Sequence, residues 1–311
     1  MDKAVTYIIL LNHHGLEDTI ECVRSLQKLA SKAYKIVIVD NSNGENDWNR
    51  LIDFASVSSQ SFIDFYEGKT PEYQQQSLVL IKALANKGFA QGNNLGLQFA
   101  IQQTDAHYFW ILNNDTVVDS KSLSALISYH SKHPETILGS KLVYYNAPDQ
   151  IQAVGGAFDE KLYICTHIGE GFPKNTPKTK FSTIDYPVGA SMFVNRKFVE
   201  ETGFLNEEFF LYFEELDWVK RGSVKGYQPD WCEDSIVYHK EGKSIGSSYK
   251  HEKSLFSETT LFKSRKKFIE KYYSLNFKFY FSSLLLITNR LRKGKFRVAR
   301  ELIKITFNDV K

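Results

Sequence analysis

Residues 107–115, HYFWILNND, show the pattern that decides the fold. Most of the first six are aromatic or aliphatic, as is typical of a strand buried on both faces. The last three are polar and end the strand at a turn. The same pattern recurs at 5–15, where an apolar run leads into Asn12, and at 34–44, where it leads into Asp40. These segments predict buried strands with polar ends.

Stretches with helical periodicity alternate with these strands. They lie at 17–29, 92–102 and 122–131, and a further strand is predicted at 78–83. Alternating strands and helices predict an α/β fold whose sheet is mostly parallel, with right-handed crossovers. In open α/β sheets, ligands bind where the strands end. We therefore expect the polar strand ends to form a ligand-binding edge.

The second half of the chain has a different pattern, with shorter strands and loops that carry Gly and Pro. We predict a mixed sheet there that closes over the ligand edge. The predicted strands lie at 142–145, 163–167, 188–194 and 236–239, and the predicted helices at 209–220 and 254–273.

The composition is that of a globular protein. Apolar residues make up 42% of the 311, which excludes a disordered or collagen-like chain. The net charge of +3 is too small to indicate a nucleic-acid partner. The three cysteines lack metal-ligand spacing and predict free thiols in a reducing compartment, so we expect a cytoplasmic protein. The first apolar run is too short to span a bilayer.

The stretch 86–96, NKGFAQGNNLG, has features of a phosphate-binding loop. Gly88 and Gly92 allow close backbone approach, Lys87 offers a positive charge, and 92–94 are predicted to open a helix whose free amides suit an anion. The spacing fits neither GxGxxG nor a Walker loop. An Asn-capped helix behind a flexible loop explains the stretch equally well.

Asn113, Asn114 and Asp115 form a candidate metal site. Mg²⁺ and Mn²⁺ prefer oxygen ligands, and a single carboxylate flanked by amides needs a substrate diphosphate to complete the site. His239 follows a predicted strand and is a candidate second ligand through a neutral imidazole. The alternatives are a helix-capping turn at Asp115 and an ordinary hydrogen-bonding histidine.

Glu214, Glu215 and Asp217 lie among aromatic residues, as in the run FFLYFEELDW at 209–218. An apolar setting raises the pKa of a carboxyl group and makes it a better general base. The alternative is that acids in the first turn of a helix stabilise the helix dipole.

These segments, in this order, resemble the family 2 glycosyltransferases with the GT-A fold, particularly bacterial rhamnosyltransferase-like members. The resemblance covers about four-fifths of the chain and implies a Rossmann-like central sheet flanked by helices. It implies a GT-A domain over 1–250, with a nucleotide-binding half at 1–136 and an acceptor or catalytic half at 137–250. A helical extension rich in basic and aromatic residues follows at 251–311.

The resemblance also implies residue roles. Asn12 and Asp40 would hold the base and ribose, and Asp115 matches the metal-binding end of the DxD motif, with His239 near the diphosphate. Glu215 stands where the family usually has an aspartate base, and the choice between Glu214 and Glu215 is open. Asp217 is a further catalytic candidate, for orienting the acceptor, or else a helix cap. The donor-binding candidates are Asn12, Asp40, Asn41, Lys87, Gly88, Asn93, Asn113 and Asn114.

The function implied is inverting, Mn²⁺- or Mg²⁺-dependent hexosyl transfer in cell-surface polysaccharide synthesis. The donor would be dTDP-rhamnose or a UDP-sugar, and the acceptor a glycan or lipid-linked glycan. Asn113 and Glu215 replace aspartates of the family pattern, which keeps open a catalytically weakened sugar-nucleotide or glycan-binding module.

The segment 277–307 mixes aromatic and aliphatic residues with Lys and Arg. This pattern predicts an amphipathic helix on an anionic membrane surface, such as the inner face of the plasma membrane. A helical cap on the domain and a homodimer interface are the alternatives.

Overall fold

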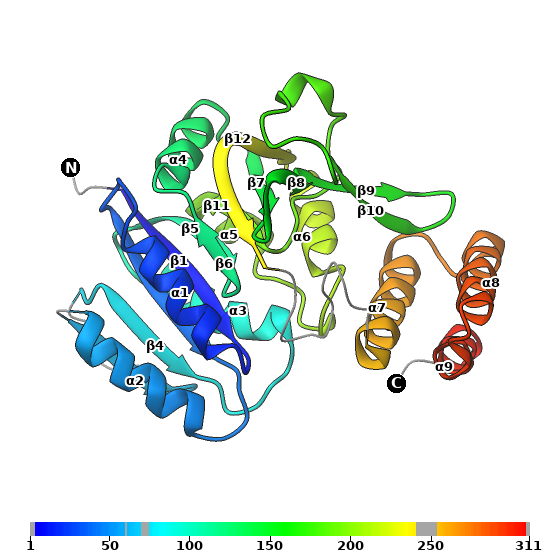
Figure 1. Cartoon of the computed structure of the whole chain (residues 1–311), viewed down its shortest axis with the longest axis horizontal. Coiled ribbons are helices and arrows are strands. Elements are labelled where there is room, and N and C mark those ends of the chain that lie inside the picture. The colour runs from blue at the N-terminus through cyan, green and yellow to red at the C-terminus, as the bar shows by residue number, and fades with distance from the viewer. Residues whose placement is uncertain (1–3, 60, 70–74, 241–253, 309–311) are drawn as a thin grey trace.

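The computed structural model describes residues 4–59, 61–69, 75–240 and 254–308, and a ten-stranded sheet organises most of them (Figure 1). The strand order is β3-β4-β2-β1-β5-β11-β7-β12-β6, with β8 paired to β7. Its strands are β1 (Val5–Asn12), β2 (Tyr34–Asp40), β3 (Phe62–Tyr66), β4 (Leu78–Lys82), β5 (Ala106–Asn113), β6 (Thr116–Val118), β7 (Thr136–Tyr144), β8 (Ala147–Ala153), β11 (Ser191–Asn195) and β12 (Gln228–His239).

The N-terminal half of this sheet is parallel, as predicted. β1 pairs in parallel with β2 and with β5, and β4 pairs in parallel with β2 and β3. The register places Asn12 opposite Asp40, and Leu11 opposite Asn113. The polar strand ends therefore meet at one edge, and the predicted α/β fold class is confirmed.

Helices cover both faces of the sheet and create two cores. α1 (Leu16–Leu26), α2 (Asn46–Ser58) and α4 (Ser122–Lys132) pack on the face that carries Ile8 and Leu10. α3 (Phe89–Ile101), α5 (Arg196–Thr202) and α6 (Glu214–Ser223) pack on the face that carries Tyr7 and Ile9. Successive strand residues point to opposite faces, so the continuous apolar runs feed both cores.

The strands of the second half pair both in parallel and in antiparallel, as predicted, but they extend the central sheet, which corrects the prediction that they close over the ligand edge. β11 joins β5 in antiparallel register, β7 joins β11, and β12 joins β7, so both halves share one sheet. The strand expected at 236–239 is the end of a longer strand, β12, whose register shifts between Cys232 and Ile236. Glu233 and Asp234 lie in this irregularity, and because both are polar, the sequence pattern did not indicate a strand there. A small hairpin, β9 (Gly155–Asp159) and β10 (Ile164–Ile168), stands beside the sheet.

Two helices begin at positions other than those predicted. α3 begins at Phe89, and Gly92 N already donates to Gly88 O, so the amides expected to be free at 92–94 lie within the helix. α6 begins at Glu214 rather than at 209, because Tyr212 and Phe213 adopt left-handed backbone angles that a right-handed helix does not contain.

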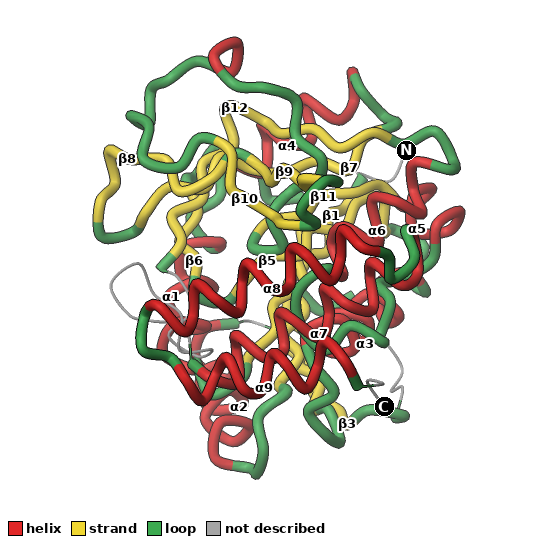
Figure 2. The backbone as a smooth tube through the Cα atoms, turned by 90° about the vertical axis from the view of Figure 1, so that its right-hand side faces the viewer, coloured by secondary structure: helices red, strands yellow, loops and turns green. Residues whose placement is uncertain are grey.

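The C-terminal extension is helical, as predicted. It consists of α7 (Leu255–Tyr272), α8 (Phe277–Arg292) and α9 (Phe296–Phe307), which lie side by side in Figure 2. Phe268 of α7 and Phe279 of α8 belong to the domain core, and α8 and α9 also pack on α7 around a smaller core that includes Leu302. The boundary predicted at 250 lies outside the described residues. In the described parts of the chain, we find no helix long and apolar enough to cross a membrane.

Candidate active site

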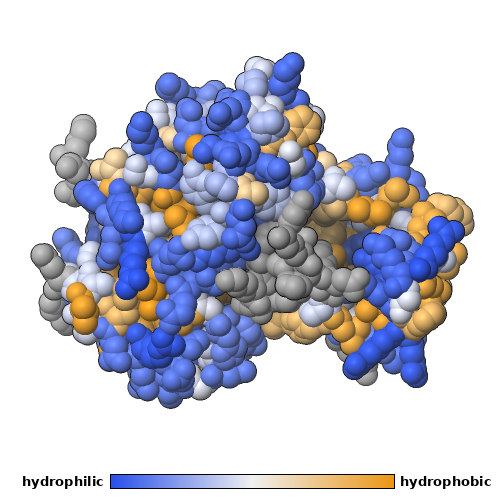
Figure 3. All heavy atoms as spheres, in the orientation of Figure 1, coloured by the Kyte–Doolittle hydropathy of each residue, from blue (hydrophilic) through white to orange (hydrophobic). Residues whose placement is uncertain are grey.

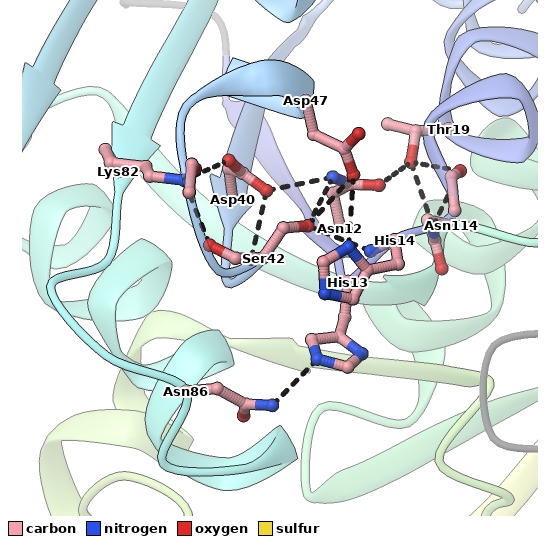
Figure 4. A network of polar contacts seen from close by, with 12 residues as sticks. Asn12, His13, His14, Thr19, Asp40, Ser42, Asp47, Lys82, Asn86 and Asn114 are labelled. Atoms are coloured by element: carbon pink, nitrogen blue, oxygen red, sulfur yellow. Dashed lines mark hydrogen bonds and ion pairs between the residues drawn. The ribbon is translucent and has the colours of Figure 1, made fainter.

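A buried hydrogen-bond network joins the ends of β1, β2 and β4 (Figure 4). Asn12 Nδ2 donates to Asp40 Oδ1 at 2.9 Å and to Ser42 Oγ at 3.2 Å. Lys82, which is 4% exposed, donates to Asp40 Oδ2 at 2.7 Å. A fully buried carboxylate needs such a counter-charge. The structure thus brings Asn12 and Asp40 together and adds Ser42 and Lys82, which the sequence analysis missed. The sequence feature that could have indicated Lys82 is its position as a single lysine at the end of an apolar strand.

Asn114 joins this network through Thr19. Thr19 Oγ1 donates to Asn12 Oδ1 at 2.9 Å and accepts from Asn114 Nδ2 at 2.9 Å. All three side chains are buried, so they brace the sheet edge from within. His14 is exposed at the same edge, with its Nδ1 3.8 Å from an Asp47 carboxylate oxygen.

The loop that precedes α3 connects the two halves of the domain. Asn41 Nδ2 donates to Asn86 Oδ1 at 2.9 Å, and Asn86 Nδ2 lies 2.8 Å from His13 Nε2. Burial lowers the pKa of His13, which favours a neutral imidazole at this contact. On the other side, Gly88 has φ of +101°, and a Cβ there would lie 2.1 Å from Phe210 O. The close approach that Gly88 allows is therefore to the backbone just before the acidic segment.

The other residues predicted for the nucleotide pocket differ in their surroundings. Lys87 is exposed. Asn93 is buried in α3 and donates to a main-chain carbonyl one turn earlier, at 2.9 Å. Its neighbour Asn94, which was not predicted, bonds the main chain of Leu205 through both its amide nitrogen and its amide oxygen. Of these side chains, Lys87 is the exposed one, and the buried Oδ1 of Asn93 finds no hydrogen-bond partner among the described residues.

His239 lies against the DxD-like segment. Its Nε2 is 3.2 Å from Asp115 Oδ1 and 3.4 Å from Asn113 Nδ2. The register of β12 on β6, which places His239 opposite Thr116, creates this proximity. On its other side, His239 Nδ1 lies 2.9 Å from Gln152 Oε1. Because Gln152 Oε1 can only accept, this contact places a proton on Nδ1, and Nε2 is the ring nitrogen that faces Asp115.

The Asp115–His239 pair fits a divalent cation. Two ligand atoms at right angles, each roughly 2.1 Å from one ion, lie about 3 Å apart. Lys240 N donates to Asp115 O at 3.0 Å, and Lys240 Nζ is 2.6 Å from Asp18, which holds this end of β12 against α1. Among the residues that the structure describes, no group of three or more His, Cys, Asp or Glu side chains could hold a metal. A cation here would need ligands besides the Asp115 and His239 side chains.

The acidic segment begins in a strained conformation. Tyr212 and Phe213 have φ of 70° and 72°, which is rare for non-glycine residues and costs of the order of 1–3 kcal/mol each. The reversal places Glu214 and Glu215 in the first turn of α6. One carboxylate oxygen of each is buried and finds no hydrogen-bond partner among the described residues. Strain beside unpaired buried carboxylates is characteristic of functional sites.

The two glutamates have unusual acidities. Burial raises the pKa of Glu215 to about 7. Burial, and then the nearby charge of Glu215, raises the pKa of Glu214 well above its ordinary value. Helix-dipole stabilisation would favour the charged forms, so burial outweighs it. The charge of an ionised Glu215 therefore opposes the ionisation of Glu214.

Asp217 has a different environment. It is fully buried, and its oxygens accept from Arg221 at 2.8 Å, Lys271 at 2.6 Å and Tyr272 at 2.8 Å. Burial by itself would raise the pKa of Asp217, but these three bonds hold it below the ordinary value. Two of the donors lie on α7, so Asp217 fastens the C-terminal extension to α6.

The sequence model of glycosyl transferase family 2 matches residues 7–203, which is more than half of the chain. The chain belongs to glycosyl transferase family 2. The matched residues include the Asn12–Asp40 network, the loop before α3 and the DxD-like segment. Glu215 and His239 lie beyond the match.

Several characterised proteins are similar to this family 2 chain. The low-salt glycan biosynthesis hexosyltransferase Agl10 of Haloferax volcanii is 20% identical over 234 residues, which are 75% of this chain and 66% of that protein. The structure of GalNAc-T7 with UDP, GalNAc and Mn²⁺ has a TM-score of 0.60 at 15% identity, over 84% of this chain and 47% of that one. The structure of S. aureus TarS 1-349 has a TM-score of 0.52 at 11% identity, over 97% of this chain and 81% of that one.

These findings confirm the family and the GT-A type fold that the resemblance implied. The chain spans just under two thirds of Agl10 and less than half of the GalNAc-T7 chain. The rhamnosyltransferase-like detail stays a prediction, as do the donor, the acceptor and the residue roles.

Proposed function

We propose that this family 2 member is an inverting glycosyltransferase that uses a divalent cation and a nucleoside-diphosphate sugar. The observation that carries the proposal is the Asp115–His239 pair, two candidate ligand atoms 3.2 Å apart at the ligand-binding edge of the sheet. The similar GalNAc-T7 structure contains UDP and Mn²⁺, which supports Mn²⁺ or Mg²⁺ here.

Asp115 and His239 would hold the cation together with oxygens of the donor diphosphate. When bound, the cation neutralises the charge that develops on the departing nucleoside diphosphate. Gln152 fixes the tautomer of His239 that presents Nε2. Lys87 is exposed on the loop before α3 and offers a second positive charge to the phosphates.

Glu215 is the proposed general base. It would remove the proton of the acceptor hydroxyl as that oxygen attacks the anomeric carbon and the bond to the diphosphate breaks. A pKa of about 7 leaves a useful fraction ionised at neutral pH while keeping the carboxylate basic. Glu214 is the less suitable base, because burial and the nearby charge of Glu215 both oppose its ionisation.

The donor is proposed to be dTDP-rhamnose or a UDP-sugar, and the acceptor a glycan or a lipid-linked glycan. The Asn12–Asp40 network is buried, and its proposed role is to hold the strand ends on which the base and ribose of the donor would rest. The hexosyltransferase Agl10, named for glycan biosynthesis, is consistent with an acceptor of this class.

A panel of dTDP- and UDP-sugars, tested with Mn²⁺ and with chelator, examines the proposal. We expect nucleoside-diphosphate release from one donor, dependent on the cation and reduced in Glu215→Gln. A donor that raises the melting temperature without any turnover would instead support the alternative, a binding module on the same fold.

A further inference from the structure

α8 has an apolar face that points away from the protein. Its buried face carries Phe279 and Ile287. On the opposite side, Phe277 is 80% exposed, Leu284 57% and Leu291 41%. Their spacing of seven residues is close to two helical turns, so they form one stripe. An exposed apolar stripe of this length is uncommon on a soluble surface.

α9 extends the same surface. Phe296 and Phe307 are each 69% exposed, and the Phe307 ring stacks on Tyr280 of α8 with centroids 5.9 Å apart. Figure 3 shows apolar surface around charged side chains over this end of the molecule. We call Phe277, Phe281, Leu284, Leu291, Phe296 and Phe307 the α8–α9 apolar face.

The surroundings of this face are strongly basic. Residues 277–307 contain eight Lys or Arg residues and one acidic residue, Glu301. Two of the eight, Arg290 and Lys295, bind Glu258 of α7 at 2.7 and 3.0 Å and so stabilise the packing of the helices. Arg292, Lys293 and Arg297 are exposed around the α8–α9 turn. The positive charges of these three residues therefore lie beside the apolar face.

We propose that the α8–α9 apolar face docks on the surface of an anionic lipid bilayer. Apolar side chains flanked by Lys and Arg match the acyl boundary and the anionic headgroups of such a surface. A second copy of the chain fits poorly, because a symmetric dimer would bring two basic rims together. Neither helix needs to span, since interfacial binding buries only one face.

The face is rigidly joined to the catalytic domain. Arg265 of α7 donates to Tyr163 O at 2.8 Å, beside the β9–β10 hairpin, and to Ser283 Oγ of α8 at 2.9 Å. Docking would therefore fix the orientation of the whole domain on the membrane. If the proposed function holds, this arrangement suits an acceptor carried by a lipid in the same bilayer.

Flotation of the full chain with phosphatidylcholine vesicles, with and without phosphatidylglycerol, tests the docking independently of catalysis. We expect binding to the anionic vesicles only. Phe277→Ser/Leu284→Ser should lower the bound fraction by about tenfold or more, as should Arg292→Gln/Lys293→Gln/Arg297→Gln. The control is Val57→Ser/Val224→Ser, which replaces two valines that are 90% and 84% exposed elsewhere and should leave binding unchanged.

Tryptophan insertion provides a second measurement that preserves apolar packing. The four native tryptophans, Trp48, Trp110, Trp218 and Trp231, are buried. Phe296→Trp should be quenched by brominated lipids, whereas Phe172→Trp, at a 50% exposed site far along the chain, should not. Equal flotation of the serine variant and the native chain would overturn the proposal. So would a dimer in light scattering that the same substitutions dissociate.

Discussion

Asp115 Oδ1 and His239 Nε2 lie 3.2 Å apart, although the two residues come from opposite halves of the domain. We propose that the pair supplies two ligand atoms of a cation site and that a substrate diphosphate supplies others. Asp115→Asn and His239→Gln should each weaken Mn²⁺-dependent nucleoside-diphosphate binding by at least about tenfold in calorimetry. Mn²⁺ without nucleotide should bind only weakly. His107→Gln, at an exposed histidine, is the control, and tight binding of Mn²⁺ alone would contradict the assignment.

Gln152 should matter although it is expected to touch neither metal nor substrate. Its Oε1 accepts from His239 Nδ1 at 2.9 Å and thereby directs the Nε2 lone pair. Gln152→Leu removes the acceptor and should lower the affinity for Mn²⁺–nucleotide by roughly 10–100-fold. Gln152→Glu, which keeps an acceptor, should restore most of it. Equal loss in both variants would point to packing instead.

Substitutions of the two glutamates of α6 should have different effects on kcat. Glu215→Gln should reduce kcat by roughly 10²–10⁴-fold, because general-base catalysis is worth about that much, while donor binding persists. Glu214→Gln should have a smaller effect, since burial and the charge of Glu215 oppose the ionisation of Glu214. Normal turnover in Glu215→Gln together with loss in Glu214→Gln would reverse the assignment.

Turnover and stability should respond to pH in opposite directions. Burial raises the pKa of Glu215 in the folded protein to about 7, above its ordinary 4.5. Between these values the folded chain binds more protons than the unfolded chain, so the free energy of unfolding should fall as pH rises. Over the same range kcat should rise as Glu215 ionises. Denaturant titrations and a pH–rate profile measure the two trends, and Glu215→Gln should flatten the stability trend.

Gly88 should tolerate alanine poorly. It has φ of +101°, and an added Cβ would lie 2.1 Å from Phe210 O. Gly226 is a matched control, because it has φ of +93° and open space around it. Gly226→Ala should cost about 1–2 kcal/mol for the positive φ. Gly88→Ala should cost about 1–3 kcal/mol more, because a Cβ there would overlap Phe210 and because Gly88 also has ψ of −174°, a conformation nearly restricted to glycine. Urea denaturation gives both values, and equal losses would show that the loop simply moves.

Local patterns predicted a large part of this structure. The strands that end in Asn12, Asp40 and Asn113 could be recognised because burial on both faces demands a continuous apolar run. α2 and β3 were missed, although Trp48, Leu51 and Ala55 are buried at helical spacing. Polar residues between them, together with a weakly buried strand, obscured that pattern.

The acidic segment shows where local reasoning stops. The sequence does not distinguish the three acids of α6. In the structure, Glu214 and Glu215 each have a buried carboxylate oxygen without a hydrogen-bond partner among the described residues. Asp217 instead accepts hydrogen bonds from Lys271 and Arg221. Their acidities diverge for that reason alone. Helical periodicity also predicted that α6 begins at 209, and the strained Tyr212 and Phe213 moved its start to Glu214.

The sequence by itself determined that the sheet is parallel at its N-terminal half and that polar strand ends meet at one edge, because both follow from side-chain periodicity and turn residues. It also determined the family, through ordered motifs. Only the tertiary structure decided the hydrogen-bond partners of the site residues, such as Lys82 for Asp40 and Gln152 for His239. Strand register and helix packing bring such residues together across long stretches of chain, and no local pattern encodes that choice. For the DxD-like segment, the sequence named Asp115, and the register of β12 on β6 placed His239 beside it.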